Sequence, residues 1–103
     1  MSADDKIMVT VDADLEDIVP GYLDNRQKDI VEITAAVEGG DFETIRVLGH
    51  RMKGSGGGYG FDQITDIGFA LEMASKEGNA EEIRSRVDEL RDYLARVEVT
   101  YEE

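Results

Sequence analysis

The sequence has no cysteine, a single proline and a single histidine among its 103 residues. Without cysteine, the chain can form neither a disulfide nor a thiolate metal site. No apolar run approaches the roughly 18 residues that a membrane-spanning helix needs. The acidic start, MSADDKIMVT, lacks the pattern of a signal peptide. We therefore expect a cytoplasmic protein, and its 41% apolar residues suffice for one modest core.

Basic residues are also scarce, since 11 Lys and Arg stand against 24 Asp and Glu, for a net charge of −13. Nucleic-acid phosphates and anionic membrane surfaces would repel such a chain, so we expect neither as a partner. The acidity is uneven, because the only charged residues in the window 44–61 are Arg46, Arg51 and Lys53, with His50 among them. This window arises either by chance or as a site for an anion or an acidic partner.

The rest of the pattern predicts helices, and no segment alternates convincingly with period two. Residues suited to helix termini divide the chain into four main helices: Pro20 in a first turn, Gly39, Gly40 and Gly78 at ends, and Asp41, Asp62 and Asn79 as N-caps. The last helix carries apolar residues at 4-3-4-3 spacing: Ile83, Val87, Leu90, Leu94 and Val97. We predict an all-α fold, an antiparallel up-down four-helix bundle with a short additional N-terminal helix over residues 15–19, forming one domain over residues 1–103.

A glycine tract follows the histidine in HRMKGSGGGYGF, residues 50–61, with five glycines in seven positions. It matches neither a phosphate-binding P-loop nor a Gly-x-Gly-x-x-Gly turn. A glycine inside a helix costs about 1 kcal/mol relative to alanine, so propensity alone favours a loop. The apolar stripe nevertheless continues through Met52, Gly56 and Tyr59. We therefore predict a helix that runs on to about Gly58.

Such a helix would have two unusual faces. Gly49 and Gly56 would let a neighbouring helix pack closely. Gly54 and Gly57 would leave the surface one turn beyond His50 bare of side chains. A bare surface beside a reactive side chain is suited to the docking of a protein domain.

The stretch GHRMKGSGGGYGF, continued by YGFDQITDIGFALE, resembles the motif of histidine-containing phosphotransfer (HPt) domains. The His-x-x-Lys-Gly-Ser core matches at every fixed position, and Gly49 and Met52 fit the small and apolar positions around it. The resemblance covers about residues 15–97. One departure is Gly56, where serine or alanine is common in the family.

The resemblance implies a role for several side chains. His50 would be the phosphoacceptor, Lys53 would offset charge on the phosphoryl oxygens, and Glu72, about six helical turns downstream, would orient the imidazole. An exposed imidazole is largely neutral at pH 7 and can act as a nucleophile through Nε2. The receiver docking surface would include Arg46, Val47, Gly54 and Gly57. Most methionines and aromatic residues are expected in the core.

By the same resemblance, the chain would relay a phosphoryl group between aspartates of receiver domains in a two-component phosphorelay. It would be a phosphocarrier rather than an independent enzyme. We expect no cofactor and no metal site, because the receiver domains would bring their own Mg²⁺. We also expect a free-standing monomer.

Three other readings remain open from the residues alone. The chain could be a helical adaptor that binds a receiver or kinase domain without carrying phosphate, but the presence of both His50 and Lys53 argues against that. A purely structural bundle would leave the basic, glycine-rich patch without a purpose. An enzyme with chemistry in the bundle core would need inward-facing Glu or His clusters, whereas the only histidine is predicted to face outward.

Overall fold

Four helices account for most of the chain. The structure, a computed structural model, describes residues 5–103. Its helices are α1 (Val19–Glu38), α2 (Phe42–Ser55), α3 (Asp62–Lys76) and α4 (Ala80–Arg96). Two 3-10 turns, η1 (Ala13–Leu15) and η2 (Gly57–Tyr59), and two strands, β1 (Ile7–Asp12) and β2 (Val97–Glu102), complete the described fold. The prediction of four main helices is confirmed.

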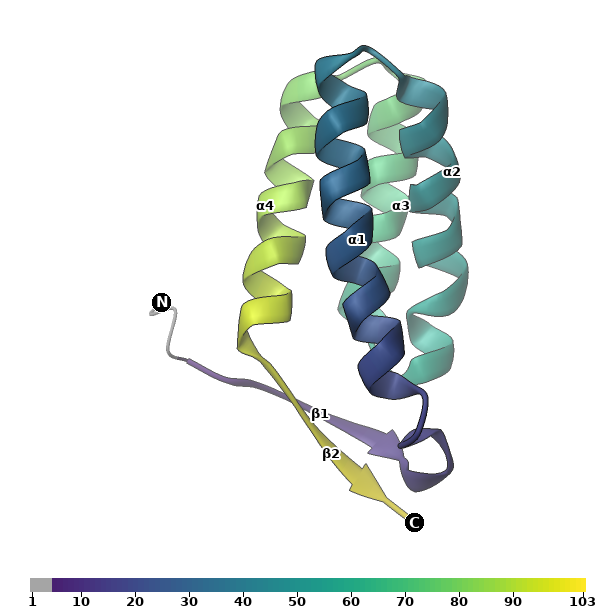
Figure 1. The fold of residues 1–103 in the computed structure, drawn as a ribbon, viewed down its shortest axis with the longest axis vertical. Coiled ribbons are helices and arrows are strands. Elements are labelled where there is room, and N and C mark those ends of the chain that lie inside the picture. The colour runs from purple at the N-terminus through teal and green to yellow at the C-terminus, as the bar shows by residue number, and fades with distance from the viewer. Residues whose placement is uncertain (1–4) are drawn as a thin grey trace.

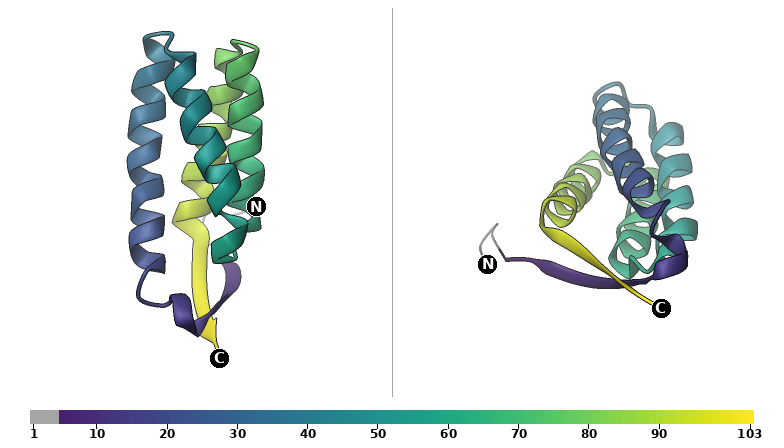
Figure 2. Two further views of the ribbon diagram at one scale, coloured as in Figure 1. Left: turned by 90° about the vertical axis from the view of Figure 1, so that its right-hand side faces the viewer. Right: turned by 60° about the horizontal axis from the view of Figure 1, so that its bottom comes forward.

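The helices lie side by side along the long axis of the molecule (Figure 1). The α1–α2 and α3–α4 links lie at the top of this view, and the α2–α3 link lies at the bottom. Figure 2 shows from two further sides that β1 and β2 lie together at the end opposite the α1–α2 link. The core runs between the helices, and each helix contributes fully buried side chains to it, among them Ile33, Ile45, Met52, Ile64, Leu71, Ile83 and Leu90.

Helix ends follow the local chemistry of the chain. Gly40 and Gly78 adopt positive φ values of 73° and 65° in the links before α2 and α4, a conformation that glycine adopts without steric cost. Asn79 caps α4, because its side-chain oxygen accepts a hydrogen bond from the Glu82 N–H at 3.1 Å. Asp62 was expected to cap α3, but it is the first residue of that helix and Phe61 occupies the cap position.

The all-α prediction is wrong at both ends of the chain. Strands β1 and β2 pair in parallel, with Ile7 opposite Val97 and Asp12 opposite Glu102. Val97 was assigned to the last helix, but it begins β2. Alternating residues of both strands pack against the core, and Val11 is only 2% exposed. The two strands therefore cover one end of the bundle with a small apolar face.

A buried arginine joins this pair of strands to the bundle. Arg96, the last residue of α4, is 6% exposed. Its Nε donates a hydrogen bond to the Asp5 carbonyl, and one terminal nitrogen contacts the Asp92 carboxylate, both at 2.8 Å. The guanidinium thus fixes the start of β1 to the point where α4 becomes β2.

The expected N-terminal helix over residues 15–19 is also wrong in its position and type. Asp12 accepts a hydrogen bond from the Asp14 N–H at 2.8 Å and begins η1, a single 3-10 turn. Helix α1 begins only at Val19, with Pro20 in its first turn as predicted. A 3-10 turn closes its hydrogen bond between residues three apart rather than four, so it suits such a brief connection.

Candidate functional site

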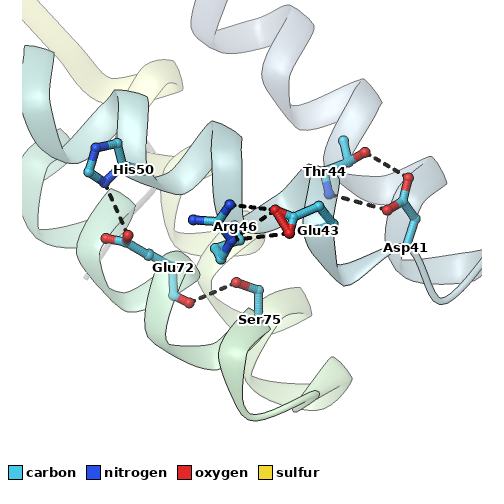
Figure 3. Close-up of polar contacts among 7 residues, drawn as sticks. All are labelled: Asp41, Glu43, Thr44, Arg46, His50, Glu72 and Ser75. Atoms are coloured by element: carbon cyan, nitrogen blue, oxygen red, sulfur yellow. Dashed lines mark hydrogen bonds and ion pairs between the residues drawn. The ribbon is translucent and has the colours of Figure 1, made fainter.

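Helix α2 presents His50 to solvent. Asp41 caps the start of the helix, because its carboxylate accepts hydrogen bonds from the Thr44 hydroxyl at 2.6 Å and the Thr44 N–H at 3.2 Å (Figure 3). Both hydrogen bonds lower the pKa of the Asp41 carboxyl, and the bond from the hydroxyl has the larger effect. The opposite face of α2 buries Ile45 and Met52 in the core. The side chain of His50 is consequently 63% exposed.

Helices α2 and α3 approach each other so closely that glycine is required on both. A β-carbon on Gly49 would lie 2.8 Å from both the Glu72 nitrogen and the Gly68 carbonyl oxygen. A β-carbon on Gly68 would lie 2.5 Å from the Lys53 nitrogen. The prediction that Gly49 allows close packing is confirmed, and Gly68 is its counterpart on α3. This close contact brings Glu72 next to the ring of His50.

The carboxylate of Glu72 contacts both His50 and Lys53. Its Oε2 lies 3.1 Å from His50 Nδ1, and its Oε1 lies 2.9 Å from Lys53 Nζ (Figure 3 shows the histidine contact). The Glu72 side chain is only 6% exposed. The hydrogen bond from Lys53 is the main cause that lowers the pKa of Glu72, and the contact with His50 acts in the same direction against the effect of burial.

The contact with Glu72 fixes how a neutral His50 ring carries its proton. An ionised carboxylate can only accept hydrogen bonds, so Nδ1 must be the donor. Nε2 of the neutral ring then keeps its lone pair, and it lies on the side of the ring away from Glu72 (Figure 3). The arrangement can therefore present a nucleophilic nitrogen to a partner that approaches from solvent.

The basic character seen in the sequence is largely neutralised in space. Arg46 forms an ion pair with Glu43, one turn earlier on α2 (Figure 3). This contact raises the pKa of Arg46 and lowers that of Glu43. Lys53 is paired with Glu72 from the neighbouring helix. A charge count within the window 44–61 missed both carboxylates, because one lies just before the window and the other on α3.

The other residues expected in the docking surface surround His50 unevenly. Gly54 and Gly57 are exposed, and a β-carbon on Gly54 would have no neighbouring atom within 4 Å. Val47 is half-buried and lines a groove between α1 and α2 that also contains Glu32 and Arg51. Arg46 and Val47 thus precede His50 on α2 by about one turn, and Gly54 and Gly57 follow it.

The glycine tract is helical for less of its length than predicted. Helix α2 ends at Ser55, not at about Gly58, and the 3-10 turn η2 follows at Gly57–Tyr59. Gly60 then adopts a φ of 92° and reverses the chain toward α3. Gly56 is buried, and a β-carbon there would lie 2.6 Å from the Thr65 nitrogen, so its predicted role in close packing is confirmed. We call residues 54–60 the glycine turn.

Two apolar side chains beside the site were not expected from the sequence. Phe69 and Met73 lie on α3, and they are 52% and 41% exposed. The Lys53 ammonium lies 5.8 Å from the centre of the Phe69 ring. Phe69 and Met73 are one helical turn apart, so they share a face of α3 that is not its buried face. This spacing was the signal in the sequence that could have indicated them. Most aromatic and methionine residues were expected in the core, and within residues 5–103 these two and Met8 are exposed exceptions.

Two negative findings apply to the described part of the chain. Within residues 5–103, no group of three or more metal-binding side chains comes together. Over the same range, no helix combines the length and apolar character that crossing a membrane requires.

A comparison with protein families identifies the family of the chain. The family model described as the Hpt domain matches residues 17–100. The chain belongs to the Hpt domain family, whose members serve in histidine phosphotransfer in two-component signalling. No curated protein and no solved structure matches the chain in the corresponding searches.

Proposed function

We propose that the protein carries a phosphoryl group on His50 between aspartates of receiver domains. The observation that carries this proposal is the exposed ring of His50, held through Nδ1 by the buried carboxylate of Glu72 at 3.1 Å. No other histidine is present in the sequence. The protein is then a phosphocarrier that depends on its partners for catalysis and needs no cofactor of its own.

The proposed transfer begins with an acyl phosphate on a receiver aspartate. The Nε2 lone pair of neutral His50 forms a bond to phosphorus as the bond from phosphorus to the aspartyl oxygen breaks. The aspartate leaves as a carboxylate with the bonding electron pair, and the ring becomes a phosphoimidazolium that keeps its proton on Nδ1. Glu72 stabilises this positive ring. Transfer to a second aspartate is the same step in reverse.

Lys53 is proposed to act on the phosphoryl oxygens. In the resting structure its ammonium is bound to Glu72 at 2.9 Å, so it lies close to the ring that would be phosphorylated. A dianionic phosphoryl group on Nε2 would compete with Glu72 for this cation. Lys53 could then offset charge during transfer, while Glu72 continues to hold Nδ1.

The proposed docking surface combines bare backbone with apolar side chains. Gly54 and Gly57 leave room beside His50, and Phe69 and Met73 add exposed apolar area on α3. Arg46 and Val47 extend the surface along α2. Exposed apolar groups next to a reactive side chain are typical of an interaction site, and a receiver domain is the partner that the chemistry requires.

We propose that the four helices form an antiparallel up-down bundle, that residues 1–103 act as one domain, and that the protein works as a monomer in the cytoplasm.

The experiment that tests the proposal is incubation with phosphorylated receiver domains. We expect labelled phosphate on the protein that is labile in acid and stable in base, as a phosphohistidine is. His50→Gln should fold normally and carry no label. Binding of a receiver domain without any transfer would instead favour the adaptor function, and label remaining on His50→Gln would place the phosphate elsewhere.

A further inference from the structure

Helix α2 ends at a hydroxyl group that helix α3 supplies. Within residues 5–103, the last backbone bond of α2 runs from the Gly56 N–H to the Met52 carbonyl at 3.0 Å. The next bond of an α-helix would join the Gly57 N–H to the Lys53 carbonyl. Thr65 Oγ1 takes its place: it accepts from the Gly57 N–H at 2.8 Å and donates to the Lys53 carbonyl at 3.1 Å.

Gly56 leaves room for the Thr65 hydroxyl. A β-carbon on Gly56 would lie 2.7 Å from Thr65 Oγ1, so any other residue there would push α3 away. After Gly56 the chain continues as η2, in which the Gly60 N–H bonds to the Gly57 carbonyl at 3.1 Å. The Thr65 hydroxyl therefore bonds two main-chain groups whose helical bond to each other is absent where the α-helix becomes a 3-10 turn.

Tyr22 and Phe61 hold other parts of the glycine turn. The Tyr22 hydroxyl hydrogen-bonds to Ser55 at 2.8 Å, and its ring stacks on Tyr59. The Phe61 N–H bonds to the Gly56 carbonyl at 2.8 Å.

The exposed glycines have fewer neighbours. β-Carbons built on Gly54 and Gly58 would meet no atom within 4 Å, and one built on Gly57 would meet only side-chain oxygens of Asp62 and Thr65. Glycine itself restricts the backbone least of all residues. The backbone at Gly57 thus depends on bonds from elsewhere for its shape, and Thr65 supplies one of them from α3.

We propose that Thr65 is a positioning residue for receiver docking, because its hydroxyl holds the glycine turn in the shape that keeps the surface beside His50 open. This inference rests on the proposed function. The hydroxyl bonds main-chain groups and touches neither the His50 ring nor Glu72. Loss of the hydroxyl should therefore weaken docking more than it slows the chemical step.

The test compares Thr65→Val and Thr65→Ala with Thr65→Ser, which keeps a hydroxyl. Thr34→Val is the matched control, because Thr34 donates a similar bond to the Ile30 carbonyl at 2.7 Å on α1. Thr34 also lines a groove between α1 and α4. Each variant is titrated with a phosphorylated receiver domain in single-turnover transfer, well below its melting temperature. Hydrogen exchange of the Gly57 amide is measured in parallel.

Val and Ala at position 65 should speed Gly57 exchange at least tenfold. They should also raise the receiver concentration for half-maximal transfer about five- to tenfold, as expected for lost hydrogen bonds, with the maximal rate within twofold. Thr65→Ser and Thr34→Val should match the wild type. Unchanged titrations for Val and Ala, or an equal shift for Thr34→Val, would overturn the inference. If the wild type accepts no phosphate, the proposed function fails, whereas the Gly57 exchange still decides whether Thr65 holds the turn.

Discussion

Gly68 on α3 lies against the backbone of Lys53 on α2, so that a β-carbon on Gly68 would approach the Lys53 nitrogen to 2.5 Å. Backbone cannot move aside as the end of a flexible side chain can. The helices α2 and α3 can therefore lie this close only because Gly68 and Gly49 carry a hydrogen atom in place of a side chain. The contacts of Glu72 with His50 and Lys53 depend on the distance between the two helices.

Gly68→Ala should force the two helices apart. Overpacking costs about 1–3 kcal/mol, whereas the gain in helix propensity is at most about 1 kcal/mol, so we expect a net loss of stability. The transfer rate should fall as well, because Glu72 moves away from His50. Chemical denaturation and single-turnover transfer measure the two effects. Gly54→Ala is the matched control for stability alone, since Gly54 is helical and has open space around it.

Gly54→Ala itself should separate stability from function. The substitution should raise the melting temperature by about 5 °C through helix propensity, and Gly57→Gln should change it little, because neither glycine has a positive φ. Both should slow transfer, Gly57→Gln more strongly, because each adds a side chain to the docking surface. A sharp fall in melting temperature at both positions would contradict the helical and 3-10 geometry of the glycine turn.

The lowered pKa of Glu72 predicts how its contribution to stability changes with pH. The pKa is lowered in the folded state, first by Lys53. The ionised carboxylate therefore stabilises the fold above the ordinary glutamate pKa of about 4.3, and this contribution is lost as the pH falls through the lower folded value. We compare the melting temperature of His50→Gln with that of His50→Gln combined with Glu72→Gln. The difference between the two should stay the same from pH 6 to pH 9.

The same two variants should converge as the pH falls below about 4. The His50→Gln background removes the titration of the histidine from the comparison, which leaves Lys53 as the cationic partner. A difference that grows in acid would mean that the folded protein raises, rather than lowers, the pKa of Glu72.

The sequence allowed much of the helical part of the fold to be predicted, because helix signals are local. Helical spacing, the Asn79 cap and the glycines that end helices all act within a few residues, and Gly49 already indicated close packing. The contact of Glu72 with His50 could not be worked out from spacing. It spans two helices, and only the family resemblance suggested it.

The missed features are those that depend on distant residues. The sequence VEVTYE of β2 does alternate, but Val97 also fitted the helical spacing of the preceding residues. An isolated strand pair is marginal on its own, and the partner strand lies at the other end of the chain. The ion pairs of Arg46 and Lys53 were missed for the same reason, because a linear window cannot count a carboxylate on a neighbouring helix.

The strand pair should stabilise the bundle without taking part in phosphotransfer. Val11 is 2% exposed and packs against the core, whereas Met8 on the other face of β1 is 61% exposed. Val11→Ala should therefore cost about 2 kcal/mol in unfolding free energy, and Met8→Ala should stay within about 0.5 kcal/mol of the wild type. Denaturant unfolding measures both changes.

At saturating receiver concentration and a temperature where both variants are folded, transfer to His50 should remain within twofold of the wild type. A loss of transfer in fully folded Val11→Ala would mean that the strand pair contributes to the phosphotransfer site. An equal loss of stability in Val11→Ala and Met8→Ala would mean that β1 does not pack on the bundle through its Val11 face.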